Sequence, residues 1–155
     1  MFKRLFAASI WAHGAVPPEE WKYRNLKRIT LPFIDFMFIL GGISAARYGV
    51  PAISEFFDDL VVDAFSYSLS FVAFLCLLGV SFPRLWGLEA IAKSALIGLM
   101  GGYVVSLFLL TAVGEGNRGF VLIVATVALA LPVWRLSLLG AEWQERRLTD
   151  GRSHG

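Results

Sequence analysis

The chain has 155 residues, of which 57% are hydrophobic and 17% are charged, and its formal net charge is only +2. A soluble domain is about 45–50% apolar, so a core this small cannot bury the excess, and we expect lipid to solvate much of the surface. The small net charge argues against a basic nucleic-acid-binding surface, and we expect no nucleic-acid partner.

Residues 1–30 are predicted to form a cytoplasmic and interfacial segment. Within Met1–His13 the apolar side chains, Ile10 among them, fall near one face beside Lys3 and Arg4. This pattern is typical of an amphipathic helix that lies in the membrane interface. A basic cluster then precedes the first apolar run, and we expect it to contact anionic lipid headgroups. The cluster consists of Lys22, Arg24, Lys27 and Arg28.

Four apolar runs are long enough to cross a bilayer, which takes about 20 helical residues. They lie at about 31–48, 64–82, 90–113 and 120–139. Each must be helical, because lipid cannot hydrogen-bond to exposed backbone groups. The predicted fold is therefore all-α, an integral membrane four-helix bundle that forms a single domain over 1–155. Residues 140–155 are predicted to be a cytoplasmic tail.

The connection between the first two spans carries a possible further helix. Pro51 can begin it, with an apolar stripe that includes Phe56 and Leu60. Such a helix either lies on the outer leaflet or runs straight into the second span. Its acidic residues lack the glycine turn and the ligand spacing of a calcium loop, so we interpret them as a solvated face. They are Glu55, Asp58, Asp59 and Asp63.

The basic residues are distributed unevenly about the spans. Only Arg47 and Arg118 fall on one side of the predicted membrane, and twelve fall on the side that carries both termini. Since cytoplasmic segments are enriched in Lys and Arg, both termini are predicted to be cytoplasmic, in a multi-pass protein of the inner membrane. The twelve are Lys3, Arg4, Lys22, Arg24, Lys27, Arg28, Arg84, Lys93, Arg135, Arg146, Arg147 and Arg152.

Asp35 is the one acid within the predicted spans, and Lys93 is its natural partner at a similar depth in the third span. A charge at the bilayer centre costs about 2.5–3.5 kcal/mol on insertion scales, so such residues are usually paired or functional. Asp35 is part of a proton or cation site, forms a salt bridge that fixes helix packing, or extends its carboxylate to the inner interface. We favour the two structural interpretations, because a transport path usually needs several polar groups.

Two spans carry stripes of small residues at helical spacing. Such stripes let another backbone approach closely, which is a main source of helix association in lipid. The contacts would lie either within one bundle or between the subunits of a homo-oligomer. The residues are Ser94, Gly98, Gly102 and Ser106 in the third span, and Gly41, Gly42 and Ala45 in the first.

Other polar residues of the spans carry weaker signals. Ser66, Ser68 and Ser70 either line a wet path or bond to their own backbone, and we favour the second. Cys76, the only cysteine, is interpreted as a packing residue. The chain has no GxSxG, HExxH or phosphate-binding glycine motif, and we expect no enzymatic activity, cofactor or metal.

The whole architecture resembles that of bacteriophage holins, particularly those of phages that infect actinobacteria. The similarity is carried by the basic segment 22–28, the loop Phe82-Pro83-Arg84-Leu85-Trp86, the small-residue stripe 94–106 and the charged tail 142–147. It implies that copies accumulate in the inner membrane, associate through small-residue faces and rearrange into a lesion that admits a cell-wall-degrading enzyme.

In a holin-like protein, Gly98 and Gly102 would be the assembly contacts, and Asp35 with Lys93 would set the timing. Two alternatives stay open. One is a small proton-coupled exporter that depends on Asp35. The other is a non-catalytic structural or adaptor subunit bound to another membrane protein.

Overall fold

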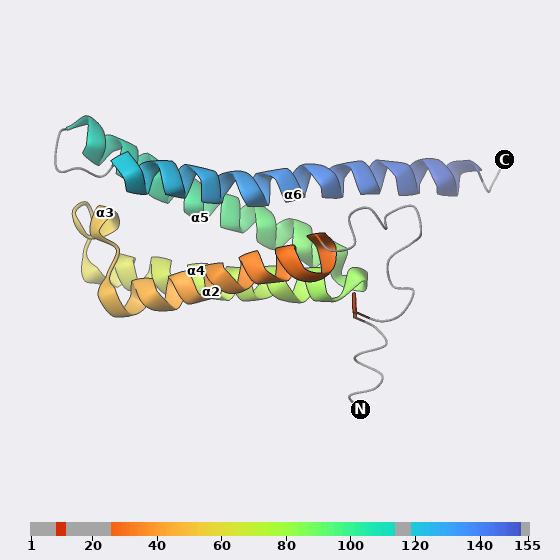
Figure 1. Cartoon of the computed structure of the whole chain (residues 1–155), viewed down its shortest axis with the longest axis horizontal. Helices are drawn as coiled ribbons and strands as arrows, with labels where there is room; N and C mark the ends of the chain where they lie inside the picture. The colour runs from red at the N-terminus through yellow and green to blue at the C-terminus, as the bar shows by residue number, and fades with distance from the viewer. Residues whose placement is uncertain (1–8, 12–25, 114–118, 153–155) are drawn as a thin grey trace, which may run out of the picture.

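The computed structural model describes residues 9–11, 26–113 and 119–152, and this part of the chain is all-helical, with no strand. Figure 1 shows the four long helices: α2 (Leu31–Tyr48), α4 (Asp59–Ser81), α5 (Trp86–Ala112) and α6 (Gly119–Arg152). One π-helical turn, η2 (Leu26–Thr30), leads into α2. Two short elements, α3 (Pro51–Ser54) and η3 (Pro83–Leu85), lie in the connections.

Four helical segments of 21 to 27 residues are long and apolar enough to cross a membrane: three lie within α4, α5 and α6, and the first, Arg28–Tyr48, combines the end of η2 with α2. At about 1.5 Å per residue these segments reach the roughly 30 Å of a bilayer core. Only 17–28% of the most apolar stretch of each segment is buried within the chain. Most of the apolar side chains therefore face outward, as in a multi-pass membrane protein.

The bounds of α2 and of the membrane-spanning part of α6, Gly119–Gly140, agree closely with the predicted spans 31–48 and 120–139. Helices α4 and α5 begin several residues earlier than predicted, and α6 continues beyond its spanning part to Arg152. Pro132 lies inside α6 without ending it, as lipid-embedded helices tolerate. In the 51–63 region neither alternative holds in full: residues 51–54 form the short helix α3, with Ile53 buried, and residues 59–63 begin α4.

The long helices pack in chain order: α2 on α4, α4 on α5, and α5 on α6. In Figure 1, α2 and α4 lie side by side, α6 lies at the opposite edge, and α5 crosses obliquely between them. The short helix α3 contacts α5 and α4. The four helices therefore form an open array in which α2 and α6 are the outer members.

The central core lies between α4 and α5, where Leu69 and Cys76 pack against Leu96 and Met100. Cys76 is 0% exposed, in agreement with its interpretation as a packing residue. A second cluster joins Ala52 of α3 to Leu107 of α5 and to α6. The short helix α3 thus occupies space between the long helices at one end of the array.

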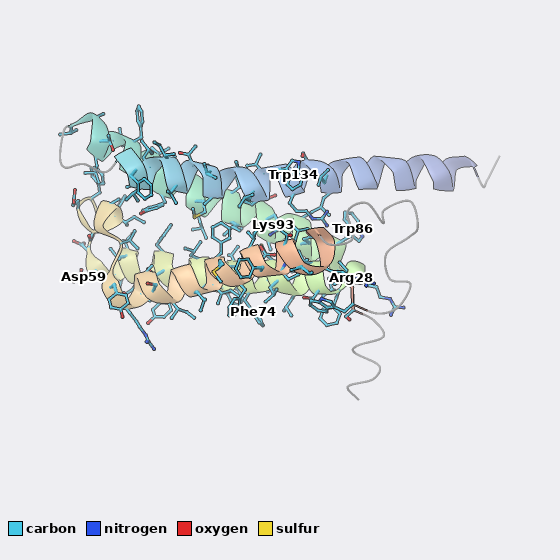
Figure 2. The ribbon with its side chains drawn as sticks, viewed as in Figure 1. Arg28, Asp59, Phe74, Trp86, Lys93 and Trp134 are labelled. Atoms are coloured by element: carbon cyan, nitrogen blue, oxygen red, sulfur yellow. The ribbon has the colours of Figure 1, made fainter. Side chains whose placement is uncertain are left out.

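The start of α2 lies at the same end of the array as the end of the α6 span (Figure 1). Figure 2 places Arg28, Trp86 and Trp134 at or toward this end and Asp59 at the opposite one. We call the first the terminal end and the second the far end. Beyond Gly140, α6 projects past the other helices by about 18 Å at 1.5 Å per residue.

Most of the predicted interfacial segment lies outside the described residues, including Lys22 and Arg24. The described Ile10 does not belong to a lipid-facing helix: it lies in a turn, is 6% exposed, and donates its backbone N–H to the Ser81 carbonyl oxygen at 2.9 Å. The Trp11 indole N–H donates to the Arg28 carbonyl oxygen at 3.0 Å. At Ile10 the predicted lipid-facing position is therefore wrong, because the side chain is buried against the protein.

Candidate functional site

The first part of the site is an ion pair between α2 and α5. Asp35 lies in the first turns of α2 and is 0% exposed, and Lys93 of α5 is 1% exposed. The Lys93 ammonium donates to Asp35 Oδ1. The structure therefore pairs Asp35 with Lys93, the two residues that were expected to lie at a similar depth in the membrane.

The second part was not predicted and joins α5 to α6. Arg135 donates to Glu89 through two nitrogens of its guanidinium group, Nε to Oε1 at 2.7 Å and Nη2 to Oε2 at 3.1 Å. Both residues are buried: Glu89 is 3% exposed and Arg135 is 6% exposed. Such a two-point contact is the strongest geometry available to an arginine and a carboxylate.

This pair is not evident from the sequence, because Glu89 falls just outside the predicted third span and Arg135 is one of the twelve basic residues assigned to the cytoplasmic side. The sequence nevertheless contains a pattern that could have indicated this pair. Glu89 and Lys93 are four residues apart, so they share one face of a helix, and Arg135 lies a few residues inside the end of the fourth span. With Lys93 and Arg135 buried, ten basic residues remain for the predicted cytoplasmic side.

Together the four residues form what we call the charge network, Asp35, Lys93, Glu89 and Arg135. Helix α5 contributes one acid and one base, one turn apart, while α2 contributes an acid and α6 a base, so the charges cancel. Figure 2 shows Lys93 between α2 and α6, toward the terminal end. The network therefore connects both outer helices of the array to α5.

The chemistry open to the charge network is limited. No group of three His, Cys, Asp or Glu residues that could hold a metal ion occurs in the described part of the chain. Asp35 Oδ2 is buried and has no hydrogen-bond partner among the described residues. One carboxylate oxygen is therefore available to accept a proton or a hydrogen bond, and the remaining polar atoms hold helices together.

Two glycines permit the close helix contacts within the chain. A Cβ on Gly42 of α2 would lie 2.2 Å from Ser70 Oγ and 2.7 Å from the Ser70 backbone nitrogen on α4. A Cβ on Gly79 of α4 would lie 2.7 Å from Cα of Glu89, so this glycine positions an acid of the charge network. Side chains at either position would push helices apart.

The small residues of α5 make no such contact. Gly98 and Gly102 are exposed, and an added Cβ would meet no atom within 4 Å. Ser94 and Ser106 donate to carbonyl oxygens of their own helix, at 2.9 and 3.0 Å. In the first span, Ala45 packs beside the Val50 cluster, whereas Gly41 meets open space.

The serines of α4 behave in two ways. Ser66 Oγ donates to the Val62 carbonyl oxygen at 2.8 Å, the bond to its own helix that we favoured. Ser70 Oγ instead donates to the Ile39 carbonyl oxygen of α2 at 3.4 Å. That prediction is wrong for Ser70, because the close approach at Gly42 brings the α2 backbone within reach.

The acidic residues at the far end, from Glu55 to Asp63, are all exposed, in agreement with a solvated face.

Comparison of the chain with protein-family models, with curated proteins and with solved structures finds no match. Its function is therefore to be inferred from the charge network and from the helix faces that the chain leaves open.

Proposed function

We propose that this chain is a holin-like membrane protein, copies of which self-associate in the inner membrane through α5 and permeabilise that membrane. One observation carries the proposal. Gly98 and Gly102 have no neighbour within 4 Å of an added Cβ, whereas Gly42 and Gly79 are fully used in contacts within the chain. The face best suited to close helix packing is thus without a partner in the part of the chain that the structure describes.

The contact face continues along the length of α5. We call it the open face. Its residues recur at spacings of three and four, with glycines in the middle of the face and larger side chains toward both ends. Apolar side chains alone give helices little reason to associate in lipid, while close backbone approach does. A second copy in the same orientation offers the same bare face. The open face consists of Ile91, Ala95, Gly98, Gly102, Val105 and Leu109, all exposed.

Permeabilisation requires polar groups that can line a water-filled path. The charge network supplies two acids and two bases that the single chain keeps buried. Movement of α2 or α6 away from α5 would expose them, and the cost of separating the pairs would delay that step. In this proposal Asp35 and Lys93 set the timing, as the resemblance to holins implies.

The proposal includes an orientation with both termini in the cytoplasm. Four spans bring the two flanks of the membrane domain to the same side, and ten basic residues besides Lys93 and Arg135 fall on that side in the sequence. The basic cluster at Lys22, Arg24, Lys27 and Arg28 would then bind anionic headgroups of the inner leaflet.

Self-association is tested by disulfide crosslinking in membranes. The Cys76→Ala background removes the native thiol, and Gly98→Cys places a new thiol on the open face. We expect rapid formation of a crosslinked dimer, and loss of that dimer when Gly102→Leu is added. Ala130→Leu, a small-to-large change at an exposed position of α6, is the control and should leave crosslinking unchanged.

Permeabilisation is tested by inducible expression in a bacterial host while membrane potential and dye entry are followed. Abrupt depolarisation in the wild type, absent in Gly102→Leu at equal membrane expression, is the expected result. Normal potential and growth with confirmed wild-type membrane expression would overturn the proposal. Stable co-purification of another membrane protein in that case would favour the adaptor alternative.

A small proton-coupled exporter is the second candidate, favoured by the buried and unpartnered Asp35 Oδ2. In liposomes that carry the purified protein, transport driven by a pH gradient would be lost in Asp35→Asn, because an amide cannot release a proton. Asp35→Glu, which keeps a carboxylate, should retain part of it. Equal activity of Asp35→Asn and wild type would exclude this function.

A further inference from the structure

A pocket of about 320 Å³ lies between α2, α4 and α5, in the far half of the membrane domain. Its walls are mainly apolar: Phe38 from α2, Phe65 and Leu69 from α4, and Met100 from α5. Between Phe38 and Tyr48, the α2 residues that line the pocket are small: Gly41, Ser44 and Ala45. None of these residues belongs to the charge network or to the open face of α5.

The pocket follows from the way the helices cross. The Asp35–Lys93 ion pair holds α2 to α5 toward the terminal end, while α5 runs obliquely to α2 and α4 (Figure 1). At the far end α3 packs against α5 and α4. Between these two contacts the small residues of α2 leave the space unfilled, and a Cβ on Gly41 would meet nothing within 4 Å.

The mouth of the pocket faces outward along α2. Gly41, Ser44 and Tyr48 line the pocket and are exposed, Tyr48 at 83%. The lining extends along α2 from Phe38 to Tyr48, ten residues further along the helix, which is about 15 Å at 1.5 Å per residue. That length is roughly half of a 30 Å hydrocarbon core. In a membrane crossed by the segment Arg28–Tyr48, the pocket would extend along about one leaflet, and its exposed side along α2 would face that leaflet.

We propose that this pocket binds one hydrocarbon chain of a lipid from the leaflet at the far end of the molecule. The walls are mainly apolar, so a hydrocarbon chain matches their chemistry and would make the contacts that an empty space leaves unmade. A volume of about 320 Å³ is roughly twice the 150 Å³ of an engineered apolar cavity that holds benzene, and so has room for a stretch of methylene groups. An extended chain that enters beside Tyr48 matches both the length and the polarity of the site.

Binding of the chain gains little from the hydrophobic effect, because the surrounding lipid is equally apolar. Its physical basis is the gap itself: an unfilled space leaves the walls without contacts on one side. A chain in the pocket restores those contacts for Phe65, Leu69 and Met100. It would thereby support α2 against α5 in the half of the membrane that the ion pair does not reach.

The test is native mass spectrometry of the full chain purified from membranes in mild detergent. We expect one retained lipid per chain, with the mass identifying its class. Gly41→Leu projects a side chain into the pocket and should reduce the lipid-bound fraction to background. Gly140→Leu, the same replacement at an exposed position of α6 where an added Cβ also meets nothing within 4 Å, should keep the lipid.

A photoactivatable lipid with its reactive group in the acyl chain gives an independent measurement. Labelling concentrated on the pocket walls of α2 and α5, at Ala45 and Tyr103, is expected, and labelling spread evenly over exposed positions such as Ile43 would overturn the proposal. Retention of lipid by Gly41→Leu, or retention of detergent alone by the wild type, would also overturn it. If Gly41→Leu lowers only the dimer fraction, the pocket receives a second copy, and the lipid proposal fails while self-association stands.

Discussion

Replacing Lys93 with Met keeps the length of the side chain and removes its charge, which leaves the carboxylate of Asp35 buried without a cation. Both side chains are at most 2% exposed, so solvent screens the pair very little, and the small value of surface ion pairs does not apply. Breaking a buried pair by removing one partner costs about 3–5 kcal/mol. At about 1.4 kcal/mol per tenfold, the unfolding equilibrium constant should rise by roughly two to three and a half powers of ten.

Removing both charges should have a very different effect. In Asp35→Leu/Lys93→Met no buried charge is left unpaired, and such replacements are often neutral or stabilising by about 1–4 kcal/mol. Asp35→Leu alone should be as damaging as Lys93→Met alone. Arg47→Met, at an exposed position at the end of α2, serves as the control and should leave stability unchanged.

The assay is equilibrium unfolding of the purified variants in mixed micelles, with the four free energies combined in a double-mutant cycle. We expect a coupling energy of several kcal/mol, with the double variant close to wild type. If the double variant instead loses the sum of the two single losses, with coupling below about 0.5 kcal/mol, the pair does not hold α2 to α5. The structural role that we assign to it would then be refuted.

The same logic applies to the second pair: Glu89→Gln removes the carboxylate that Arg135 contacts at two points and should destabilise the chain by about 3 kcal/mol in the same assay, and an unchanged midpoint would contradict the buried pairing. Gly79→Ala places a Cβ 2.7 Å from Cα of Glu89 and should cost about 1–3 kcal/mol in thermal unfolding. Gly87→Ala, with no atom within 4 Å, should be neutral or slightly stabilising, and equal losses at both glycines would contradict the close contact. The Cys76 thiol is 0% exposed, so maleimide should label it only after denaturation; rapid labelling of the native protein would show that the core opens. A fluorescent protein fused to the C-terminus should fluoresce and a phosphatase fused there should be inactive, and the reverse result would invert the proposed orientation.

Hydropathy alone locates the four helices, because crossing a bilayer demands a run of apolar residues that is visible locally in the chain. The first span was predicted with the bounds that α2 has, 31–48. The partnership of Asp35 with Lys93 was also accessible, since a buried charge in lipid needs a partner and the two depths agree. These features depend on position along the chain and on little else.

Rotation of the helices about their axes is what the sequence left open. Glu89 and Arg135 lie near span ends, where either could face water, and only the packing of α6 on α5 turns them toward each other. In the same way Gly42 and Gly98 belong to similar stripes, but α4 covers the first and nothing in the described chain covers the second. Which stripe is used inside the molecule, and which is left for a partner, depends on contacts between distant segments, and those exist only in the folded array.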